Sequence, residues 1–354
     1  MITGAPPGHD LARTILVRAP NWLGDTVMAL PALSSLRAGH PDARITVLGP
    51  WAALLRGQGV ADVLLPYPPA AGERRAVTAH LRADPADLAL VLPNSLGSAV
   101  AAWRWGARRR IGFDTDARRG FLTDAPALPL PRRHQVDEYL LLAETAGAPP
   151  ARAVPRWTPA GGEAPETREV EALWTELGLP AAAPPVVGLH LGAAAGAAKQ
   201  WDAERYGHLA RLLHGAGLTP LLMGSPREAH AAEIASSAAG AIASAVGRDR
   251  PALLPALLSR LACVVSGDTG IAHLGAAVGI PTVTLFGPTD PDLTAPRGGA
   301  ARLVRHEVPC APCFLEECPI DHPCMRSIEP AEVMVEVLGA LARATAAPMS
   351  ASLP

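Results

Sequence analysis

The feature that most constrains the fold of this 354-residue chain is a twofold series of short apolar runs, each followed by a stretch with helical spacing. The runs are nearly continuous in Val, Leu and Ile, which is typical of parallel strands covered by helices on both faces. The first series comprises residues 14–19, 45–49, 62–66 and 88–93, and the second comprises 186–192, 219–224, 263–268 and 282–287. We therefore predict an α/β protein of two Rossmann-like, doubly wound domains facing a central cleft.

The composition changes between the two series. Residues 148–185 are dense in Pro and Gly around one short helical stretch, as expected of a connecting segment. The last periodic segment begins near Pro330, a residue favoured in the first turn of a helix. The predicted organisation is an N-terminal domain (1–160), a linker region (161–185), a second domain (186–330), a final helix (331–346) and a frayed tail (347–354).

The charge balance limits the classes of partner. The formal net charge is −2, so the chain has no global basic field that would indicate nucleic acid. The N-terminus lacks the pattern of a secretory signal, and no uninterrupted apolar run reaches the roughly 18 residues of a membrane span. We expect a cytoplasmic protein, or one peripheral to the cytoplasmic face of the inner membrane. The oligomeric state is left open.

The most informative loop of the second domain follows the strand at 263–268. The chain turns through Gly267, Asp268, Thr269 and Gly270 and then enters a helix that carries His273. Glycines permit a close approach of backbone to ligand, and a helix N-terminus offers unpaired N–H groups to a phosphate. A local role of Asp268 or Thr269 as the helix cap is the competing interpretation.

Two charged residues follow neighbouring strands of the same domain. Lys199 is the only lysine of the chain and lies just after a Gly/Ala loop, from which its ammonium can reach a diphosphate. The P-loop pattern itself is absent. Glu228 follows the strand at 219–224, where acidic residues often bind ribose hydroxyls. A solvated surface lysine and a glutamate in the first turn of a helix are the alternatives.

In the first domain, the strand at 14–19 leads into a helix predicted over residues 25–40, with Asp25 at its start. The helix dipole keeps such a carboxylate ionised, as a general base must be before it accepts a proton. Asn94 and Ser95 follow another buried strand and can donate to hydroxyls or phosphates. Helix capping explains Asp25, Asn94 and Ser95 equally well on local grounds.

Arginines are concentrated between residues 104 and 133. The eight are Arg104, Arg108, Arg109, Arg110, Arg118, Arg119, Arg132 and Arg133. Clustered arginines suit phosphate-bearing partners through bidentate pairing, and a merely solvated face is the alternative.

Four of the five cysteines are close together near the C-terminus. They are Cys310, Cys313, Cys318 and Cys324, and His322 lies among them. One CxxC pair with a further cysteine and histidine is sufficient for tetrahedral zinc, although a repeated CxxC would be the stronger signal. Reduced packing or reversible disulfides are favoured over a structural zinc site, and nothing in the pattern indicates a catalytic metal.

Several segments together resemble a known family. They are PNWLGDTVMALPAL (20–33), VLPNSLGSA (91–99), GAAAGAAKQWDAERYGHLA (192–210), SGDTGIAHLGAAVGIPTVTLFGPTDP (266–291) and CAPCFLEECPIDHPCM (310–325). The chain resembles the ADP-heptose:lipopolysaccharide heptosyltransferases of glycosyltransferase family nine, and most closely their type II members, over roughly residues 14 to 340. The DTGxxH block is typical of the whole family, whereas PNW, LPNS and the cysteine-rich segment favour type II.

The resemblance implies a GT-B fold with an N-terminal acceptor domain, a C-terminal nucleotide-sugar domain and a final helix that can cross back to the first domain. It also implies inverting transfer of L-glycero-D-manno-heptose from ADP-heptose to the first heptose of the phosphorylated Kdo-lipid A core at the inner membrane. No cofactor and no metal ion are required for such a transfer.

The resemblance also implies roles for individual residues. Asp25 corresponds to the base that deprotonates the acceptor hydroxyl. Donor binding falls to Lys199, Asp268, Thr269, Gly270 and His273, with Glu228 added from its place after a strand, and acceptor binding to Asn21, Trp22, Asn94 and Ser95. The chain departs from some relatives at Ala194, Ala195 and Gly196, where those relatives carry hydroxyl side chains before the lysine, so backbone N–H groups would have to replace them.

Three alternatives remain at this stage. One is a relative with another nucleotide-sugar donor or acceptor, a second is a sugar-nucleotide epimerase of the same architecture, and a third is a non-catalytic ADP-binding module. A dehydrogenase is disfavoured because RAPNWLGD stands after the first strand in place of GxGxxG.

Overall fold

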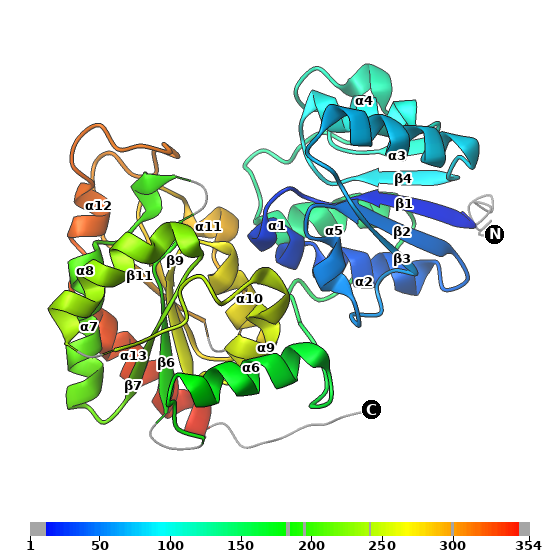
Figure 1. Ribbon diagram of the computed structural model, residues 1–354. Helices are drawn as coiled ribbons and strands as arrows, with labels where there is room; N and C mark the ends of the chain where they lie inside the picture. Colours follow the sequence, from blue (N-terminus) through cyan, green and yellow to red (C-terminus); the bar gives the residue numbers. More distant parts are fainter. Residues whose placement is uncertain (1–11, 182–184, 194–195, 241, 299–300, 347–354) are drawn as a thin grey trace, which may run out of the picture. The chain divides into compact units, whose positions relative to one another are not determined.

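The computed structural model describes residues 12–181, 185–193, 196–240, 242–298 and 301–346. The chain divides into two compact units, Met1–Ala153 and Val154–Pro354. Each unit contains a parallel sheet flanked by helices (Figure 1). The predicted α/β class with two doubly wound sheets is confirmed.

The described part of the first unit contains a five-stranded sheet of order β3-β2-β1-β4-β5. The strands are β1 (Thr14–Arg18), β2 (Arg44–Gly49), β3 (Val63–Pro66), β4 (Leu88–Val91) and β5 (Arg109–Ile111), and each neighbouring pair is parallel. The chain runs outward from β1 to β3 and resumes on the other side of β1 with β4. The loops after β1 and β4 therefore lie at the point where the strand order reverses, the usual ligand position in open α/β sheets.

The helices of the first unit are α1 (Leu23–Met28), α2 (Leu30–Gly39), α3 (Ala71–Ala83), α4 (Leu96–Arg104) and α5 (Gln135–Thr145), with short 3-10 turns η1 (Ala52–Leu55) and η2 (Arg119–Phe121). The single helix predicted over residues 25–40 is divided at Ala29. Pro31, the second residue of α2, has no N–H to donate, which explains the interruption of the helical ladder.

The described part of the second unit contains a six-stranded sheet of order β11-β10-β9-β6-β7-β8. The strands are β6 (Val186–His190), β7 (Thr219–Met223), β8 (Ala243–Ser244), β9 (Cys263–Gly267), β10 (Thr282–Phe286) and β11 (Ala301–Arg305), again with every pair parallel. Here the order reverses between β6 and β9. The loops that carry Lys199 and Asp268 follow these two strands.

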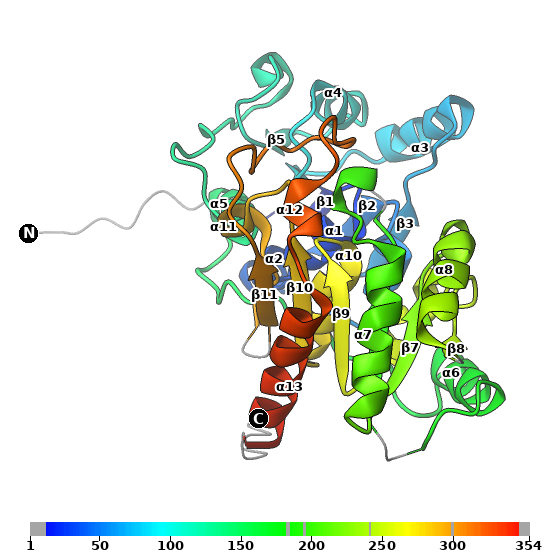
Figure 2. The ribbon, with the colours of Figure 1, turned by 90° about the vertical axis from the view of Figure 1, so that its left-hand side faces the viewer.

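The remaining elements of the second unit surround this sheet. They are α6 (Pro165–Glu176), α7 (Ala203–Gly215), α8 (Ala229–Ala239), α9 (Leu254–Ser259), α10 (Gly270–Val278), α11 (Pro291–Thr294), α12 (Pro323–Arg326) and α13 (Pro330–Ala346), with 3-10 turns η3 (Ala197–Lys199), η4 (Pro226–Glu228) and η5 (Pro251–Leu253). Figure 2 shows α7 and α13 side by side against the sheet, and the two helices are in contact.

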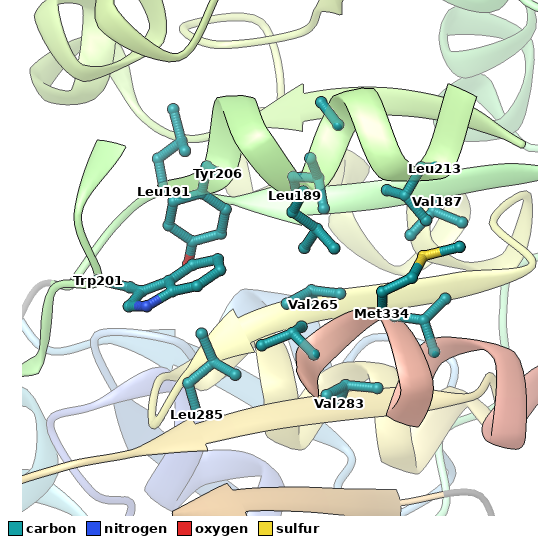
Figure 3. Close-up of a cluster of buried hydrophobic side chains, with 14 of the residues drawn as sticks. Val187, Leu189, Leu191, Trp201, Tyr206, Leu213, Val265, Val283, Leu285 and Met334 are labelled. Atoms are coloured by element: carbon teal, nitrogen blue, oxygen red, sulfur yellow. The ribbon is translucent and has the colours of Figure 1, made fainter. Parts of the chain in front are cut away.

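The core of the second unit lies between the sheet and these helices. Figure 3 shows Val187, Val265 and Leu285 from the strands in one cluster with Tyr206 of α7 and Met334 of α13. All five side chains are at most 8% exposed. The interior is thus closed by the final helix of the chain.

Two segments differ from the expected organisation. The helical stretch within the predicted linker region 161–185 is α6, and it is not a free connection because it buries Val170, Leu173 and Trp174. This helix packs against α9 and belongs to the second unit. The final helix likewise contacts α7 and strands β9 to β11 of the second unit. The expected tail, residues 347–354, lies outside the described residues.

None of the helices in the described part of the chain combines the length and the hydropathy needed to span a bilayer.

Candidate functional site

Three loops of the second unit lie together at the carboxyl ends of its strands. Strand β6 pairs in parallel with β7 on one side and β9 on the other. The carboxyl ends of all three strands therefore point the same way, and the segments after them are neighbours. These segments carry Lys199, Glu228 and the sequence Asp268–Gly270.

An ion pair joins the first and third of these loops. The Lys199 Nζ atom donates to Asp268 Oδ2 at 2.7 Å. The Asp268 side chain is 7% exposed and that of Lys199 is 18% exposed, so the pair is largely withdrawn from water. Thr289 Oγ1 donates to the same carboxylate oxygen, also at 2.7 Å. The single lysine of the chain is held by a specific buried partner, and the alternative of a solvated surface lysine is wrong.

The turn that carries Lys199 depends on a glycine. Gly196 has φ +123°, and a Cβ atom placed there would lie 2.4 Å from the carbonyl oxygen of Glu316. That same oxygen accepts a hydrogen bond from the Ala198 N–H at 2.9 Å. The cysteine-rich segment thus supports the turn from outside. The neighbouring residues Ala194 and Ala195, at which the resemblance implies backbone N–H groups in place of hydroxyl side chains, lie outside the described residues.

The segment after β9 brings the other predicted residues together. Thr269 is the N-cap residue of α10, Gly270 is its first residue, and His273 lies one turn further. His273 is 5% exposed, and its Nε2 atom is 3.9 Å from Asp268 Oδ1. Asp268, Thr269, Gly270, His273 and Lys199 therefore form one cluster at the start of a helix, with a cation and a positive helix end on the same side of the sheet.

Glu228 lies at the same edge but is engaged within its own turn. Its Oε2 atom accepts a hydrogen bond from Ser225 Oγ at 2.7 Å. A Cβ atom on Gly192 would be 3.3 Å from the Glu228 carboxyl carbon, so the side chain lies over the loop after β6. Its predicted contact with ribose stays a prediction.

Asp249 is a buried residue of this region that was not predicted from the sequence. Its Oδ2 atom accepts a hydrogen bond from the Gly224 N–H at 2.8 Å, and the residue is 7% exposed. Burial raises the pKa of the Asp249 carboxyl to about 6, and the charge of Glu228 adds to the effect. No motif marks Asp249, because its partner is a backbone group 25 residues earlier.

We expect the Asp249→Asn variant to be more stable than the unaltered protein at neutral pH. The folded-state pKa of about 6 exceeds the ordinary value of 3.8 for an aspartate, so ionisation of Asp249 disfavours the native state by up to about 3 kcal/mol above pH 6. An asparagine oxygen can accept the same bond without a charge. Urea unfolding at pH 8 should show the gain, and the gain should shrink as the pH falls toward 4. A gain that is constant with pH would contradict this explanation.

In the first unit, Asp25 is the third residue of α1 and is partly exposed. Burial raises the pKa of the Tyr139 hydroxyl well above its usual value, and the negative charge of nearby Asp25 adds to this. Trp22, the N-cap residue of α1, is 53% exposed. Asn21 accepts a hydrogen bond from Arg18 through its Oδ1 atom, so the loop after β1 is anchored to the strand that precedes it.

Asn94 and Ser95 follow β4, which pairs with β1, and so they share a sheet edge with Asn21. Ser95 caps α4 by accepting from the Ser98 N–H at 3.3 Å, which confirms the capping alternative for this residue. Asn94 Oδ1 accepts from Arg118 Nη2 at 3.2 Å. Roles of these residues in binding an acceptor stay predictions.

Most arginines of the 104–133 segment are engaged within the unit. Arg109 forms a bidentate pair with Asp124, and Arg118 is fully buried among backbone carbonyls. Burial lowers the pKa of Arg118 to about 10. Further partners are Asp87 for Arg108, Asp114 for Arg119, Glu138 for Arg132 and the Phe121 carbonyl for Arg110. Among the described residues, no carboxylate pairs with the guanidinium of Arg104 or Arg133, although the Arg133 backbone N–H donates to Glu138 Oε1 at 3.2 Å. The expected basic surface is therefore smaller than the count of arginines indicates.

The cysteine-rich segment has a structural role that its spacing does not reveal. Its cysteines are thiols in the structure, and Cys324 is buried beneath the loop after β10. The N–H groups of Cys313 and Phe314 donate to the Pro288 carbonyl at 3.0 and 2.9 Å. Among the described residues, no three His, Cys, Asp or Glu side chains are grouped to hold a metal ion. The segment supports both Thr289 and the Lys199 turn through its backbone.

Comparisons with known proteins converge. The model of glycosyltransferase family 9 (heptosyltransferase) matches residues 74–323. Lipopolysaccharide heptosyltransferase 2 of Escherichia coli is 31% identical over 82% of this chain and 87% of its own length. Lipooligosaccharide heptosyltransferase 2 of Haemophilus influenzae is 29% identical over 82% of this chain and 88% of its own length.

The solved structures agree with these sequence relatives. The structure of E. coli ADP-heptose lps heptosyltransferase II superposes with a TM-score of 0.78 at 27% identity, over 94% of this chain and 99% of that one. E. coli heptosyltransferase WaaC with ADP shares the fold, with a TM-score of 0.70 at 19% identity over 93% of this chain and 99% of that one. The predicted GT-B class is thereby confirmed.

Proposed function

The chain belongs to glycosyltransferase family 9, and from this membership we infer that it is a heptosyltransferase of lipopolysaccharide core biosynthesis. It moves a heptose from ADP-heptose to the inner core of the lipopolysaccharide precursor. The finer assignment is L-glycero-D-manno-heptose as the transferred sugar and the first heptose of Kdo2-lipid A as the acceptor.

The observation that supports donor binding most directly is the cluster around the Lys199–Asp268 pair. An ammonium has three N–H donors. Among the described residues, Lys199 Nζ donates to Asp268 Oδ2 at 2.7 Å and, at the longer distance of 3.5 Å, to the Asp268 carbonyl. The start of α10, where the Thr269 side chain makes no cap hydrogen bond, adds the backbone N–H groups of a first helical turn and the positive end of a helix dipole. We assign the donor diphosphate to this place, with Lys199, Thr269 and Gly270 in contact with its oxygens.

Asp268 and His273 have a supporting part in the same site. One oxygen of the Asp268 carboxylate, Oδ2, accepts hydrogen bonds from Lys199 and Thr289. The other, Oδ1, faces His273. The carboxylate therefore fixes the direction of the Lys199 side chain. Glu228, at the neighbouring loop, binds the ribose of the nucleotide.

The chemical step is a direct displacement at the anomeric carbon. Asp25 accepts the proton of the acceptor hydroxyl while the acceptor oxygen forms the new bond to the anomeric carbon. The bond from that carbon to the diphosphate oxygen breaks on the opposite side, so the configuration inverts and ADP leaves. Lys199 and the α10 N-terminus stabilise the negative charge that develops on the diphosphate. These groups supply the required stabilisation without a cofactor.

The acceptor assignment places the reaction at the cytoplasmic face of the inner membrane, where a lipid-linked sugar precursor is accessible to a peripheral enzyme. Asn21, Trp22, Asn94 and Ser95 lie at the loops after β1 and β4 and are the proposed acceptor contacts. Exposed Trp22 can contact the sugar. The Asn94 amide oxygen is held by Arg118, which leaves its NH2 group to donate to the sugar hydroxyls.

The assignment is tested by ADP release from the purified chain supplied with ADP-heptose, with and without heptosyl-Kdo2-lipid A, together with mass analysis of the lipid. We expect release to depend on the acceptor and the lipid to gain one heptose. Turnover only with a different sugar nucleotide would replace the donor assignment. Tight ADP-heptose binding without transfer to any core acceptor would favour a binding module and overturn the proposed activity.

A further inference from the structure

A series of three side chains, His190, Ser266 and Thr269, leads from the interior of the second unit to the first turn of α10. His190 Nδ1 lies 3.2 Å from Ser266 Oγ, and Ser266 Oγ lies 2.8 Å from Thr269 Oγ1. His190 and Ser266 are opposite each other in the register of β6 and β9. Ser266 is fully buried, and the Tyr206 hydroxyl donates to the His190 carbonyl at 2.8 Å. The sheet itself therefore fixes the geometry of this series.

The contact with Ser266 changes the hydrogen-bond partner of the Thr269 hydroxyl at the N-terminus of α10. A threonine at the N-cap position usually accepts a hydrogen bond from an N–H group of the first turn. Within the described residues, the Thr269 side chain makes no such bond to α10, and its hydroxyl is paired with Ser266 instead. The N–H groups at the start of α10 are consequently not occupied by the cap of their own helix.

The hydrogen bonds between His190, Ser266 and Thr269 can run in either of two directions, set by the tautomer of His190. Burial lowers the pKa of His190 to about 4, so the ring is neutral at pH 7 and carries one N–H. With that proton on Nδ1, His190 donates to Ser266, and Ser266 donates to Thr269 Oγ1. The O–H of Thr269 is then left to donate outward, which an anionic oxygen requires. The opposite direction would turn the Thr269 proton inward.

We propose that His190 and Ser266 are positioning residues that hold the Thr269 hydroxyl away from α10 and direct its proton to a diphosphate oxygen of the donor. The inference rests on the proposed function, because it needs a nucleoside diphosphate at α10. Neither residue touches the ligand in this arrangement. Both act through Thr269, and this indirect action can be measured.

A double-mutant cycle on ADP binding tests the coupling. Ser266→Ala and Thr269→Val should each weaken ADP binding, measured by calorimetry, by about 5- to 10-fold, the effect of one lost hydrogen bond. The double variant should bind no more weakly than Thr269→Val alone, because Ser266 has nothing left to orient. If Ser266→Ala weakens binding by the same factor in both backgrounds, its role is structural and the proposal is overturned.

Thr284→Val is the matched control. Thr284 lies beside Ser266 in the register of β10 and β9, is fully buried, and its hydroxyl has no partner among the described residues. Its removal should leave ADP affinity unchanged. An equal loss in Thr284→Val and Ser266→Ala would show that any buried hydroxyl of these strands matters, and would overturn the specific role of Ser266.

Substitutions of His190 test the direction of the protons. An asparagine amide can place an N–H donor near the position of Nδ1, whereas leucine cannot. We expect His190→Asn to retain most of the ADP affinity and His190→Leu to lose as much as Ser266→Ala. Equal affinities of the two variants would contradict the proposed direction.

The outcomes separate this inference from the proposed function. If the unaltered protein does not bind ADP, the donor assignment fails and the inference fails with it. Suppose instead that the unaltered protein binds ADP and that Ser266→Ala binds it within about twofold of the same affinity. A twofold change is less than the contribution of one hydrogen bond. In that case only the positioning role is lost, and the donor assignment stands.

Discussion

The Asp25→Asn variant is expected to lose nearly all transferase activity while it still binds ADP. Asparagine matches the shape of the carboxylate but cannot accept the proton of the acceptor hydroxyl. A positioned general base contributes about 10²- to 10⁴-fold to the rate, and we expect a loss of kcat in that range. ADP release in the presence of acceptor measures the rate, and calorimetry measures the ADP affinity.

A matched control is available in the same unit. Asp42 is exposed in the loop between α2 and β2, and Asp42→Asn removes the same charge at a distance in sequence from the loops after β1 and β4. It should retain full activity. Near-normal turnover of a correctly folded Asp25→Asn protein would remove Asp25 from the mechanism. A parallel loss of ADP affinity would instead indicate that Asp25 has a role in the structure of the protein.

The second large effect is expected for Lys199→Ala. The variant loses one charge-assisted hydrogen bond to the diphosphate, which corresponds to about 10- to 100-fold in ADP affinity. It also leaves the nearly buried carboxylate of Asp268 without its cation. Removing one partner of a buried pair typically lowers the free energy of unfolding by about 3 to 5 kcal/mol. Calorimetry with ADP and urea unfolding measure the two effects.

A second substitution separates the two effects of Lys199→Ala. Adding Asp268→Asn removes the unpaired charge, so the double variant should regain much of the lost stability without regaining ADP affinity. Arg343→Ala, an exposed cation near the end of α13, controls for the change in net charge and should alter neither quantity. Recovery of ADP affinity in the double variant would show that Lys199 serves folding alone.

The strands that position the sites could be predicted because buried parallel strands consist of continuous apolar residues. All eight predicted strands are present. The remaining strands β5, β8 and β11 could not be predicted from the sequence, for a physical reason. β5 and β11 begin or end with arginines at the edge of a sheet, and β8 has only two residues. Such short or charged edge strands have little periodicity to detect.

The cluster at α10 could be predicted in part, because Gly267, Asp268 and Thr269 are contiguous and the lysine is unique. Their partners could not be predicted. Thr289 is 21 residues from Asp268, and His190 is 76 residues from Ser266. These contacts arise only when the register of the parallel strands is known. No local spacing encodes them.

Arg118 is a residue whose exposure could not be predicted from the sequence. By residue type and neighbours it belongs with the basic surface of the 104–133 segment. The structure buries it completely, with bonds to the Pro93 carbonyl and to Asn94 Oδ1. Whether an arginine faces water depends on carbonyl groups that are distant in sequence from it, and composition carries no information about them.

The pairing of a unique lysine with Asp268 makes the protein its own spectroscopic reporter. Feeding a lysine auxotroph with amine-labelled lysine would yield one side-chain ammonium resonance, assigned without mutagenesis. Protons on a largely buried, ion-paired ammonium exchange slowly enough with solvent to be followed, and the chemical shift responds when an oxygen anion replaces water beside Nζ. The fraction of the site that is occupied could then be followed in a complete reaction mixture from the resonance of the single Lys199 Nζ atom.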